Sequence, residues 1–365
     1  MKHYILASPT DFTSENLTGA HKRFLELLNS LQKNNSIILL SGEIPQIEMG
    51  ENVTHISIAT NDIGKLPSHI SSMFHILRGI MKIPGQRKKD WVISFSPYVT
   101  ICFWLMGFSN IVSLFRENLI DYLEAIHTSA KKIKYFRIQE RLAVKGSKKI
   151  IVQCEFDKRR LLERMQPYYG DLSEKVFVQV NNVNTSWMEM VHHTGSESEI
   201  VQIVFVGQFS DCRKGHHILL PAVKRLIDNG YPISLWVAGG GKKLNEYQEQ
   251  YQSEKIVFLG HVSNIQHLFE KSDLLIVPSL IDSCPNVILE GLNAGIAVYG
   301  TNSSGIAALL ENPRYMFEPT EDSIYAFLSD ITDSKRYLED AKHQRKIIDR
   351  LTFDWSKRIE EIIVR

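Results

Sequence analysis

Residues 272–305 read SDLLIVPSLIDSCPNVILEGLNAGIAVYGTNSSG and predict a strand, a loop, a helix and a second strand in succession. The apolar run Leu274–Val277 is typical of a strand buried on both faces, and Ala297–Tyr299 predicts the next one. Pro285 suits the start of a helix, where its missing N–H costs nothing, and Gly295 suits its end. The stretch therefore predicts a βαβ unit, with its loop at the edge where parallel sheets bind ligands.

The same alternation of apolar runs and amphipathic stretches extends over the rest of the chain. His21–Leu31, for example, has apolar residues at the spacing of one helix face. Because strand–helix repeats join parallel strands by right-handed crossovers, we expect open parallel sheets covered by helices. The expected strands are 4–7, 36–40, 55–59, 91–95, 111–115, 149–153, 176–180, 200–206, 233–238, 256–259, 274–277 and 297–299, and the expected helices of the second half include 216–228, 262–271 and 285–294.

A polar stretch divides this pattern in two. Ser186–Glu199, SWMEMVHHTGSESE, predicts a linker. We therefore expect an α/β fold of two Rossmann-like, doubly wound parallel-sheet domains, residues 1–190 and residues 191–349. If such domains face each other, the carboxyl ends of both sheets line a cleft, where helix N-termini favour a phosphate-bearing ligand.

Composition excludes several classes of protein. Hydrophobic residues make up 44% of the chain and charged residues 23%, as in ordinary globular proteins, and the net charge of +1 gives no signal for nucleic acid. The four cysteines form no CxxC pair, which favours a reducing compartment over a disulfide framework. The N-terminal residues MKHYILASPTDF are typical of a first strand and not of a secretory signal, so we expect a cytoplasmic protein.

One apolar segment, Pro97–Phe115, could be read as a membrane span. A span needs about 20 uninterrupted apolar residues. Gly107, Ser109 and Asn110 interrupt this segment and are typical of a turn. We therefore expect a buried helix, a turn and a buried strand.

Two carboxylates accompany the loop and helix of the opening stretch. Asp282 lies on the loop and Glu290 one turn into the helix, so that both can face one pocket and bind sugar hydroxyls. The free N–H groups of Asn286 and Val287 at the helix start suit a phosphate. The spacing alone is equally compatible with an exposed helix acid and a loop acid that serves as a cap.

The amino-acid sequence of this stretch resembles the signature of glycosyltransferase family 4, the retaining group 1 type with the GT-B fold. That signature is PS-x-x-D-x-C-P-N-V-x-L-E-x-x-x-x-G, with seven residues between the acid and the glutamate, here Asp282 and Glu290. Asp stands in place of the commoner Glu and is one methylene shorter, which points to a different donor sugar or pose. Ile203–Gly215, IVFVGQFSDCRKG, is similar to a second family motif that ends in Lys214 and Gly215.

The resemblance implies a role for each matching residue. Glu290 would hold the ribose of a nucleoside diphosphate sugar and Asp282 the donor sugar, while Lys214 and the loop amides would stabilise the leaving diphosphate. Gln208 replaces the family's usual arginine, and Arg213 could compensate. Asp282, Glu290 and Lys214 are the expected catalytic residues, and the expected donor-binding residues are Gly19, Gln208, Arg213, Lys214, Asp282, Cys284, Pro285, Asn286, Val287 and Glu290.

The first half matches the family mainly in architecture. Gly19 is the one glycine left in Leu17–Phe24, where the family has a glycine-rich turn near the phosphates. Arg116 and Glu117 stand where many members have a histidine, and either could contact a sugar or form a surface ion pair. Phe353–Ile363 resembles the family's last helix, so residues from about 350 to 365 should pack back on the first domain.

A cluster of basic residues and a group of Cys and His residues bear on the expected membrane, nucleic-acid and metal partners. Residues 131–149, KKIKYFRIQERLAVKGSKK, hold eight basic residues and one acid, which fits either a solvated helix face or peripheral contact with an anionic membrane. No nucleic-acid recognition motif accompanies them. Cys212, His216 and His217 lack a fourth ligand at suitable spacing, so we expect no metal and no cofactor.

We therefore expect a glycosyltransferase that moves a sugar from a nucleoside diphosphate donor to an acceptor hydroxyl. The acceptor would be a glycan or a lipid-linked glycan of cell-surface polysaccharide synthesis, at the inner face of the membrane. Two alternatives remain open at this point. One is a nucleotide-sugar epimerase, and the other is a catalytically weak GT-B protein that acts as a binding partner.

Overall fold

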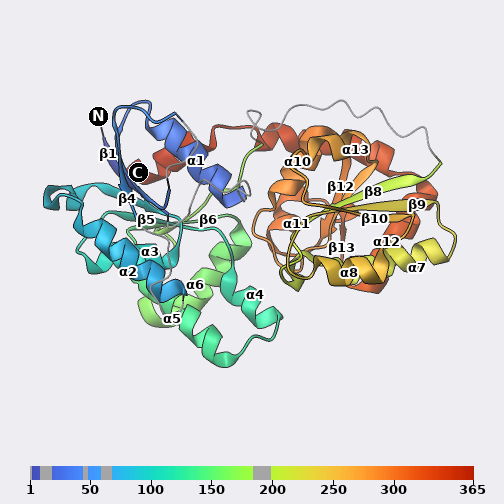
Figure 1. Ribbon diagram of the computed structural model, residues 1–365, viewed down its shortest axis with the longest axis horizontal. Coiled ribbons are helices and arrows are strands. Elements are labelled where there is room, and N and C mark those ends of the chain that lie inside the picture. Colours follow the sequence, from blue (N-terminus) through green and yellow to red (C-terminus); the bar gives the residue numbers. More distant parts are fainter. Residues whose placement is uncertain (1, 9–18, 44–47, 59–67, 184–198) are drawn as a thin grey trace. The chain divides into compact units, whose positions relative to one another are not determined.

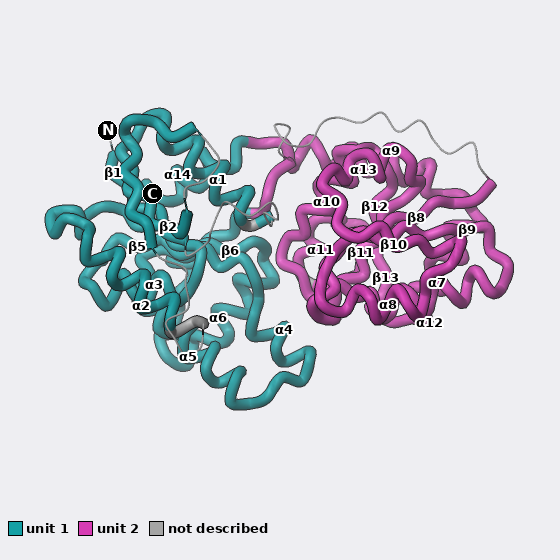
Figure 2. The backbone as a smooth tube through the Cα atoms, in the orientation of Figure 1, with its two compact units in different colours: residues 1–179, 354–365 teal, residues 180–353 magenta. Residues whose placement is uncertain are grey.

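The computed structural model describes residues 2–8, 19–43, 48–58, 68–183 and 199–365 (Figure 1). They form two compact units (Figure 2). Unit 1 comprises residues 1–179 and 354–365, and unit 2 comprises residues 180–353. The expected linker lies almost entirely outside the described residues.

Unit 1 is built on a seven-stranded parallel sheet in the order β3-β2-β1-β4-β5-β6-β7. Its helices form groups: α2, α3 and α5 pack in succession, and α1 pairs with α14. Figure 1 shows these groups on opposite faces of the sheet. The strands are β1 (His3–Ala7), β2 (Ser36–Ser41), β3 (Val53–Ser57), β4 (Trp91–Ser94), β5 (Ile111–Phe115), β6 (Lys149–Val152) and β7 (Val176–Val178). The helices are α1 (Gly19–Leu31), α2 (Ser68–Met81), α3 (Pro97–Leu105), α4 (Leu119–Ala125), α5 (Ala130–Gly146), α6 (Glu155–Tyr169) and α14 (Trp355–Val364).

Unit 2 has a six-stranded parallel sheet in the order β10-β9-β8-β11-β12-β13. Helices α7 and α12 pack together, and α10 packs on α9 and α13. The strands are β8 (Val201–Val206), β9 (Ile233–Ala238), β10 (Ile256–Gly260), β11 (Leu274–Val277), β12 (Ala297–Thr301) and β13 (Met316–Phe317). The helices are α7 (His216–Asp228), α8 (Leu244–Tyr251), α9 (Gln266–Glu270), α10 (Asn286–Ala294), α11 (Ser304–Leu310), α12 (Glu321–Ser334) and α13 (Tyr337–Leu351).

The predicted fold class of two parallel α/β sheets is confirmed. Pro97–Phe115 folds as α3, a turn at Gly107 with φ of 86° and strand β5. Among the described residues, no helix is both long enough and apolar enough to span a membrane. Some bounds differ from expectation: β3 begins two residues before the expected strand 55–59, β12 ends two residues after the expected strand 297–299, and α9 is shorter than the expected helix 262–271. In addition, β13 is an unpredicted edge strand whose two residues pair with Gly300 and Thr301.

The last helix, α14, belongs to unit 1. Trp355 is 2% exposed, and the guanidinium of Arg23 on α1 lies 5.8 Å from the centre of its ring. The hydroxyl of Ser356 donates to the backbone oxygen of Glu26, and that of Tyr4 donates to Glu360. A chain that leaves unit 1 after β7 therefore returns to it at residue 354.

Candidate functional site

The site begins where two neighbouring strands of unit 2 end. β8 and β11 pair directly, so the loops that follow them meet at one edge of the sheet. The backbone N–H of Leu280 in the second loop donates to the carbonyl of Arg213 in the first, at 2.9 Å. Gly215 has φ of +75°, and a Cβ there would lie 1.9 Å from the carbonyl oxygen of Pro278. The close approach of the two loops thus depends on a glycine.

An ion pair joins the two loops. Nζ of Lys214 lies 2.5 Å from Oδ2 of Asp282, and both side chains are largely shielded from solvent, at 24% and 14% exposed. Two residues that the sequence predicted for one site are therefore in contact. Because an ammonium group has three N–H donors, Lys214 can hold Asp282 and still bind a further anion.

Residues after β12 also form hydrogen bonds to the loop that follows β11. The carbonyl of Ser279 accepts hydrogen bonds from Thr301 Oγ1 at 2.6 Å and Ser303 Oγ at 3.1 Å. The N–H of Gly305 donates to the carbonyl of Asp282 at 3.1 Å, and a Cβ on Gly305 would lie 1.7 Å from the carbonyl oxygen of Ser283. No role was predicted for Thr301, Ser303 or Gly305, although all three lie in TNSSG, the last five residues of the stretch 272–305.

The remaining predicted residues of unit 2 lie on the same two loops and on α10. Pro285 is the N-cap of α10, and the half-buried Asn286 and Val287 follow it with N–H groups that have no partner within the helix. Glu290 is half-buried one turn further, and Cys284 is buried.

Gln208 is exposed after β8, and the N–H of Arg213 donates to Asp211. Gly19, in unit 1, is the first residue of α1.

His216 has a packing role. Its side chain is 0% exposed and lies between the rings of Phe209 and Tyr247, with both centroid distances 4.5 Å. Neither ring nitrogen has a hydrogen-bond partner among the residues that the structure describes. Burial, with nearby His217 and Lys243, lowers the pKa of His216 to about 4. Within the described ranges, no three His, Cys, Asp or Glu side chains gather as metal ligands.

Unit 1 contains a pocket of about 470 Å³ at the carboxyl ends of β1, β4 and β5. The strand order reverses between β1 and β4, which is where open α/β sheets bind ligands. Arg116 and Glu117 both line it, and the Arg116 guanidinium lies 5.9 Å from the ring centre of Phe95. Other lining residues are Ser8, His21, Phe24, Tyr98, Phe115, Phe136, Gln139 and Glu140.

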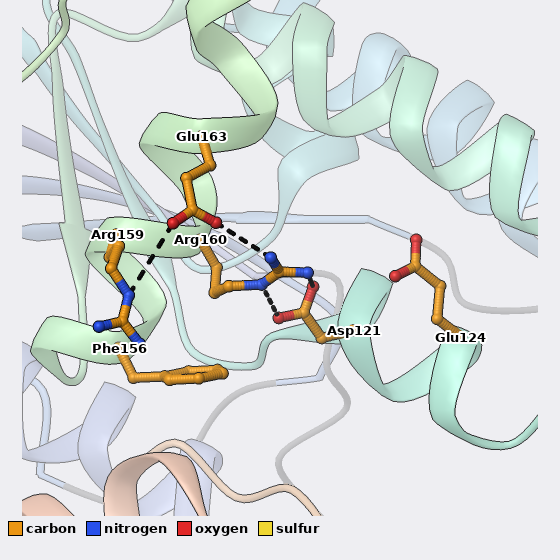
Figure 3. A pocket seen from close by; sticks show the side chains of 6 residues that line it. All are labelled: Asp121, Glu124, Phe156, Arg159, Arg160 and Glu163. Carbon is orange, nitrogen blue, oxygen red and sulfur yellow. Dashed lines mark hydrogen bonds and ion pairs between the residues drawn. The ribbon is translucent and has the colours of Figure 1, made fainter.

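A second hollow of unit 1, between α4 and α6, is filled with ion pairs (Figure 3). Arg160 binds Asp121 through two nitrogens, at 2.7 and 3.2 Å, and Glu163 at 3.0 Å. Arg164 joins Asp121 to Glu140 of α5. These contacts tie three helices together, and the charges in this hollow already have partners.

Comparison with known proteins relates part of unit 2 to one family. Residues 201–333 match the model described as glycosyl transferases group 1. Protein CapJ of Staphylococcus aureus is 26% identical over 153 residues, which are 40% of this chain and 38% of that one. The UDP-Gal:alpha-D-GlcNAc-diphosphoundecaprenol alpha-1,3-galactosyltransferase of Escherichia coli is 29% identical over 152 residues, 39% of each chain. The chain thus spans about two-fifths of the length of these curated relatives.

Solved structures agree on the fold over the whole chain. That of WaaG, a glycosyltransferase involved in lipopolysaccharide biosynthesis, superposes with a TM-score of 0.75 at 15% identity, covering 100% of this chain and 99% of that one. The resemblance read from the sequence is confirmed. The chain has the GT-B fold, and its residues 201–333 are similar to the group 1 glycosyltransferases.

Proposed function

We propose that this chain is a retaining glycosyltransferase that moves a sugar from a nucleoside diphosphate sugar to an acceptor hydroxyl. The observation that carries this proposal is the Lys214–Asp282 pair beside the N-terminus of α10, inside the part of the chain that matches the family. The E. coli relative is named for a UDP-galactose donor and a diphosphoundecaprenol-linked acceptor. Its name supports a role in cell-surface polysaccharide or lipid-linked glycan synthesis.

The chemistry requires stabilisation of a leaving diphosphate. As the bond between the sugar C1 and the phosphate oxygen breaks, negative charge builds on the diphosphate. The Lys214 ammonium and the N–H groups of Asn286 and Val287 supply fixed positive charge and hydrogen bonds for it. Asp282 accepts hydrogen bonds from the donor sugar and Glu290 from the ribose. Attack from the same face as departure gives retention, and these groups offset the charge without a bound metal.

Unit 1 would supply the acceptor side. Its 470 Å³ pocket combines aromatic faces with the charged Arg116 and Glu117. Aromatic faces pack against the apolar faces of sugar rings, and charged groups bind hydroxyls or phosphate. This combination fits a glycan acceptor, with or without a lipid diphosphate.

Helix α5 would place the enzyme at the cytoplasmic face of an anionic membrane. Lys131, Lys132, Lys134 and Arg137 are exposed on it, and Ile138 beside them is 40% exposed. Each basic residue near an anionic surface contributes about 1 kcal/mol. Reversing Lys131, Lys134 and Arg137 to Glu should abolish co-sedimentation with phosphatidylglycerol vesicles. The same reversal at exposed Lys342 and Lys346 of α13 should not, and equal loss in both would refute this role for α5.

One assay tests the proposed activity. Purified protein is incubated with UDP-, GDP- and ADP-sugars, with and without lipid-linked acceptors, and nucleoside diphosphate release is measured. We expect release from one donor class, lost in Glu290→Ala. An epimerised donor without release would identify an epimerase instead, and binding without either product would identify a non-catalytic partner.

A further inference from the structure

Asn181 connects the start of unit 2 to the loop before α10. It follows β7 in the chain and is 1% exposed. Its backbone N–H donates to Cys284 Sγ at 3.4 Å. Its side-chain Nδ2 donates to the carbonyl of Cys284 at 3.3 Å and to Oδ1 of Asn286 at 2.8 Å. One buried amide group therefore contacts the residues on both sides of Pro285.

These contacts fix which way the Asn286 amide is turned. A backbone carbonyl only accepts hydrogen bonds, so the Asn181 atom that faces Cys284 must be the nitrogen. The second N–H of that nitrogen needs an acceptor, and Asn286 provides its oxygen. Nδ2 of Asn286 is then the atom left for other partners, and the structure gives it none among the described residues.

The position of Asn286 makes this orientation matter. Asn286 is the first residue of α10, where backbone N–H groups and the helix dipole favour an anion. With Nδ2 available, its side chain adds a third donor to the backbone N–H groups of Asn286 and Val287. With the amide reversed, it would present a carbonyl oxygen to the same anion and repel it.

We infer that Asn181 is a positioning residue of the donor site, which acts through Asn286 by keeping its Nδ2 turned toward the donor diphosphate. This inference rests on the proposed function. Asn181 itself does not touch the donor. It makes the Asn286 side chain a hydrogen-bond donor before the ligand arrives, which removes the cost of reorienting the amide.

The neighbouring Asn182 offers a matched control. It is 5% exposed, and its Nδ2 donates to the backbone oxygen of Phe353 at 2.6 Å. It therefore has the same residue type and similar burial as Asn181, but its side chain bonds to the segment that leads back to unit 1. Asn182→Ala should lower the melting temperature without affecting diphosphate recognition.

A double-mutant cycle tests the inference. The ligand is whichever of UDP, GDP and ADP binds the unmodified protein most tightly. It is titrated calorimetrically into Asn181→Ala, Asn286→Ala and the double variant. The parent nucleoside of that ligand serves as the phosphate-free control. We expect each single variant to weaken the nucleoside diphosphate about tenfold, since the lost bond is to a charged group. The double variant should bind no more weakly than Asn286→Ala. Binding of the nucleoside should not change.

Several outcomes would overturn the inference. Additive losses in the double variant would mean that Asn181 acts independently of Asn286, and equal loss of nucleoside binding would mean a general collapse of the loop. An unmodified protein that binds no nucleoside diphosphate would refute the proposed function as well.

If Asn181→Ala does not fold, the NMR resonances of the Asn286 side-chain amide test the inference in the unmodified protein. They are identified by their absence in Asn286→Ala. They should shift with the nucleoside diphosphate and not with the nucleoside, and no shift would refute the inference.

Discussion

Lys214 and Asp282 lie 68 residues apart in the sequence, yet their side chains form an ion pair of 2.5 Å. The two residues stand on the loops after β8 and β11, which are adjacent strands. The pair holds a cation and a carboxylate at a fixed separation. Fixed charge of this kind stabilises a transition state without reorganisation during the reaction.

Lys214→Met should therefore reduce turnover far more than it reduces stability. The substitution keeps the apolar stem and removes the positive charge that we propose stabilises the leaving diphosphate. We expect kcat to fall by about 10²–10³-fold, the range seen when one such donor is removed. Nucleoside diphosphate release measures it. Lys224→Met is the control, because Lys224 also pairs with an aspartate, Asp228 at 2.9 Å, but on the exposed face of α7. A similar loss in the control would contradict the assignment.

Gln208→Arg should tighten donor binding. Gln208 is exposed at the end of β8, where the family's usual residue is an arginine. A hydrogen bond from a charged donor is worth about 1 kcal/mol more than a neutral one, so Kd for the nucleoside diphosphate should fall roughly fivefold to tenfold. Calorimetric titration gives the value. Gln250→Arg adds the same charge at an exposed site on α8, and an equal gain there would show that net charge alone is responsible.

The sequence predicted individual strands and helix ends well, because these depend on short patterns of neighbouring residues. The run Leu274–Val277 and the Pro285 start of α10 depend on neighbouring residues, and both are found. β13 was missed because two residues carry no periodicity and pair only through the edge of β12.

The site was predicted only as far as its motifs reach. Lys214 and Asp282 lie in recognisable sequence motifs. The Asn181–Asn286 bond joins positions 105 residues apart, and no pattern in either segment records which amide atom faces the other. The sequence predicted no metal at Cys212, His216 and His217, but it did not reveal that Phe209 and Tyr247 enclose the ring of His216. Such contacts are set by tertiary packing.

Gly305→Ala should destabilise unit 2 and the loop after β11 together. A Cβ at this position would lie 1.7 Å from the Ser283 carbonyl oxygen and 2.8 Å from that of Asp282. Backbone atoms cannot move aside without breaking the hydrogen bond from Gly305 to Asp282, so we expect a loss above about 2 kcal/mol in the free energy of unfolding. Denaturant unfolding measures it. Gly240→Ala is the control, since a Cβ there meets no atom of the described part of the chain within 4 Å. Equal losses in the two variants would mean that the Ser283 contact is not the cause.

Stability should fall with pH in a window set by His216. Burial keeps its pKa in the folded protein at about 4, whereas an unfolded histidine titrates near 6.5. As pH falls from about 6.5 to about 4, the unfolded chain therefore takes up a proton that the folded chain does not, and the folded state loses stability. His216→Phe removes this titration and keeps a ring between Phe209 and Tyr247. The decrease in melting temperature between pH 7 and pH 4.5 should be smaller in this variant than in the unmodified protein. His343→Phe, at a half-exposed histidine on α13, should leave the decrease unchanged. If His216→Phe shows the same decrease as the unmodified protein, then other groups cause it and the buried, neutral state of His216 makes no contribution.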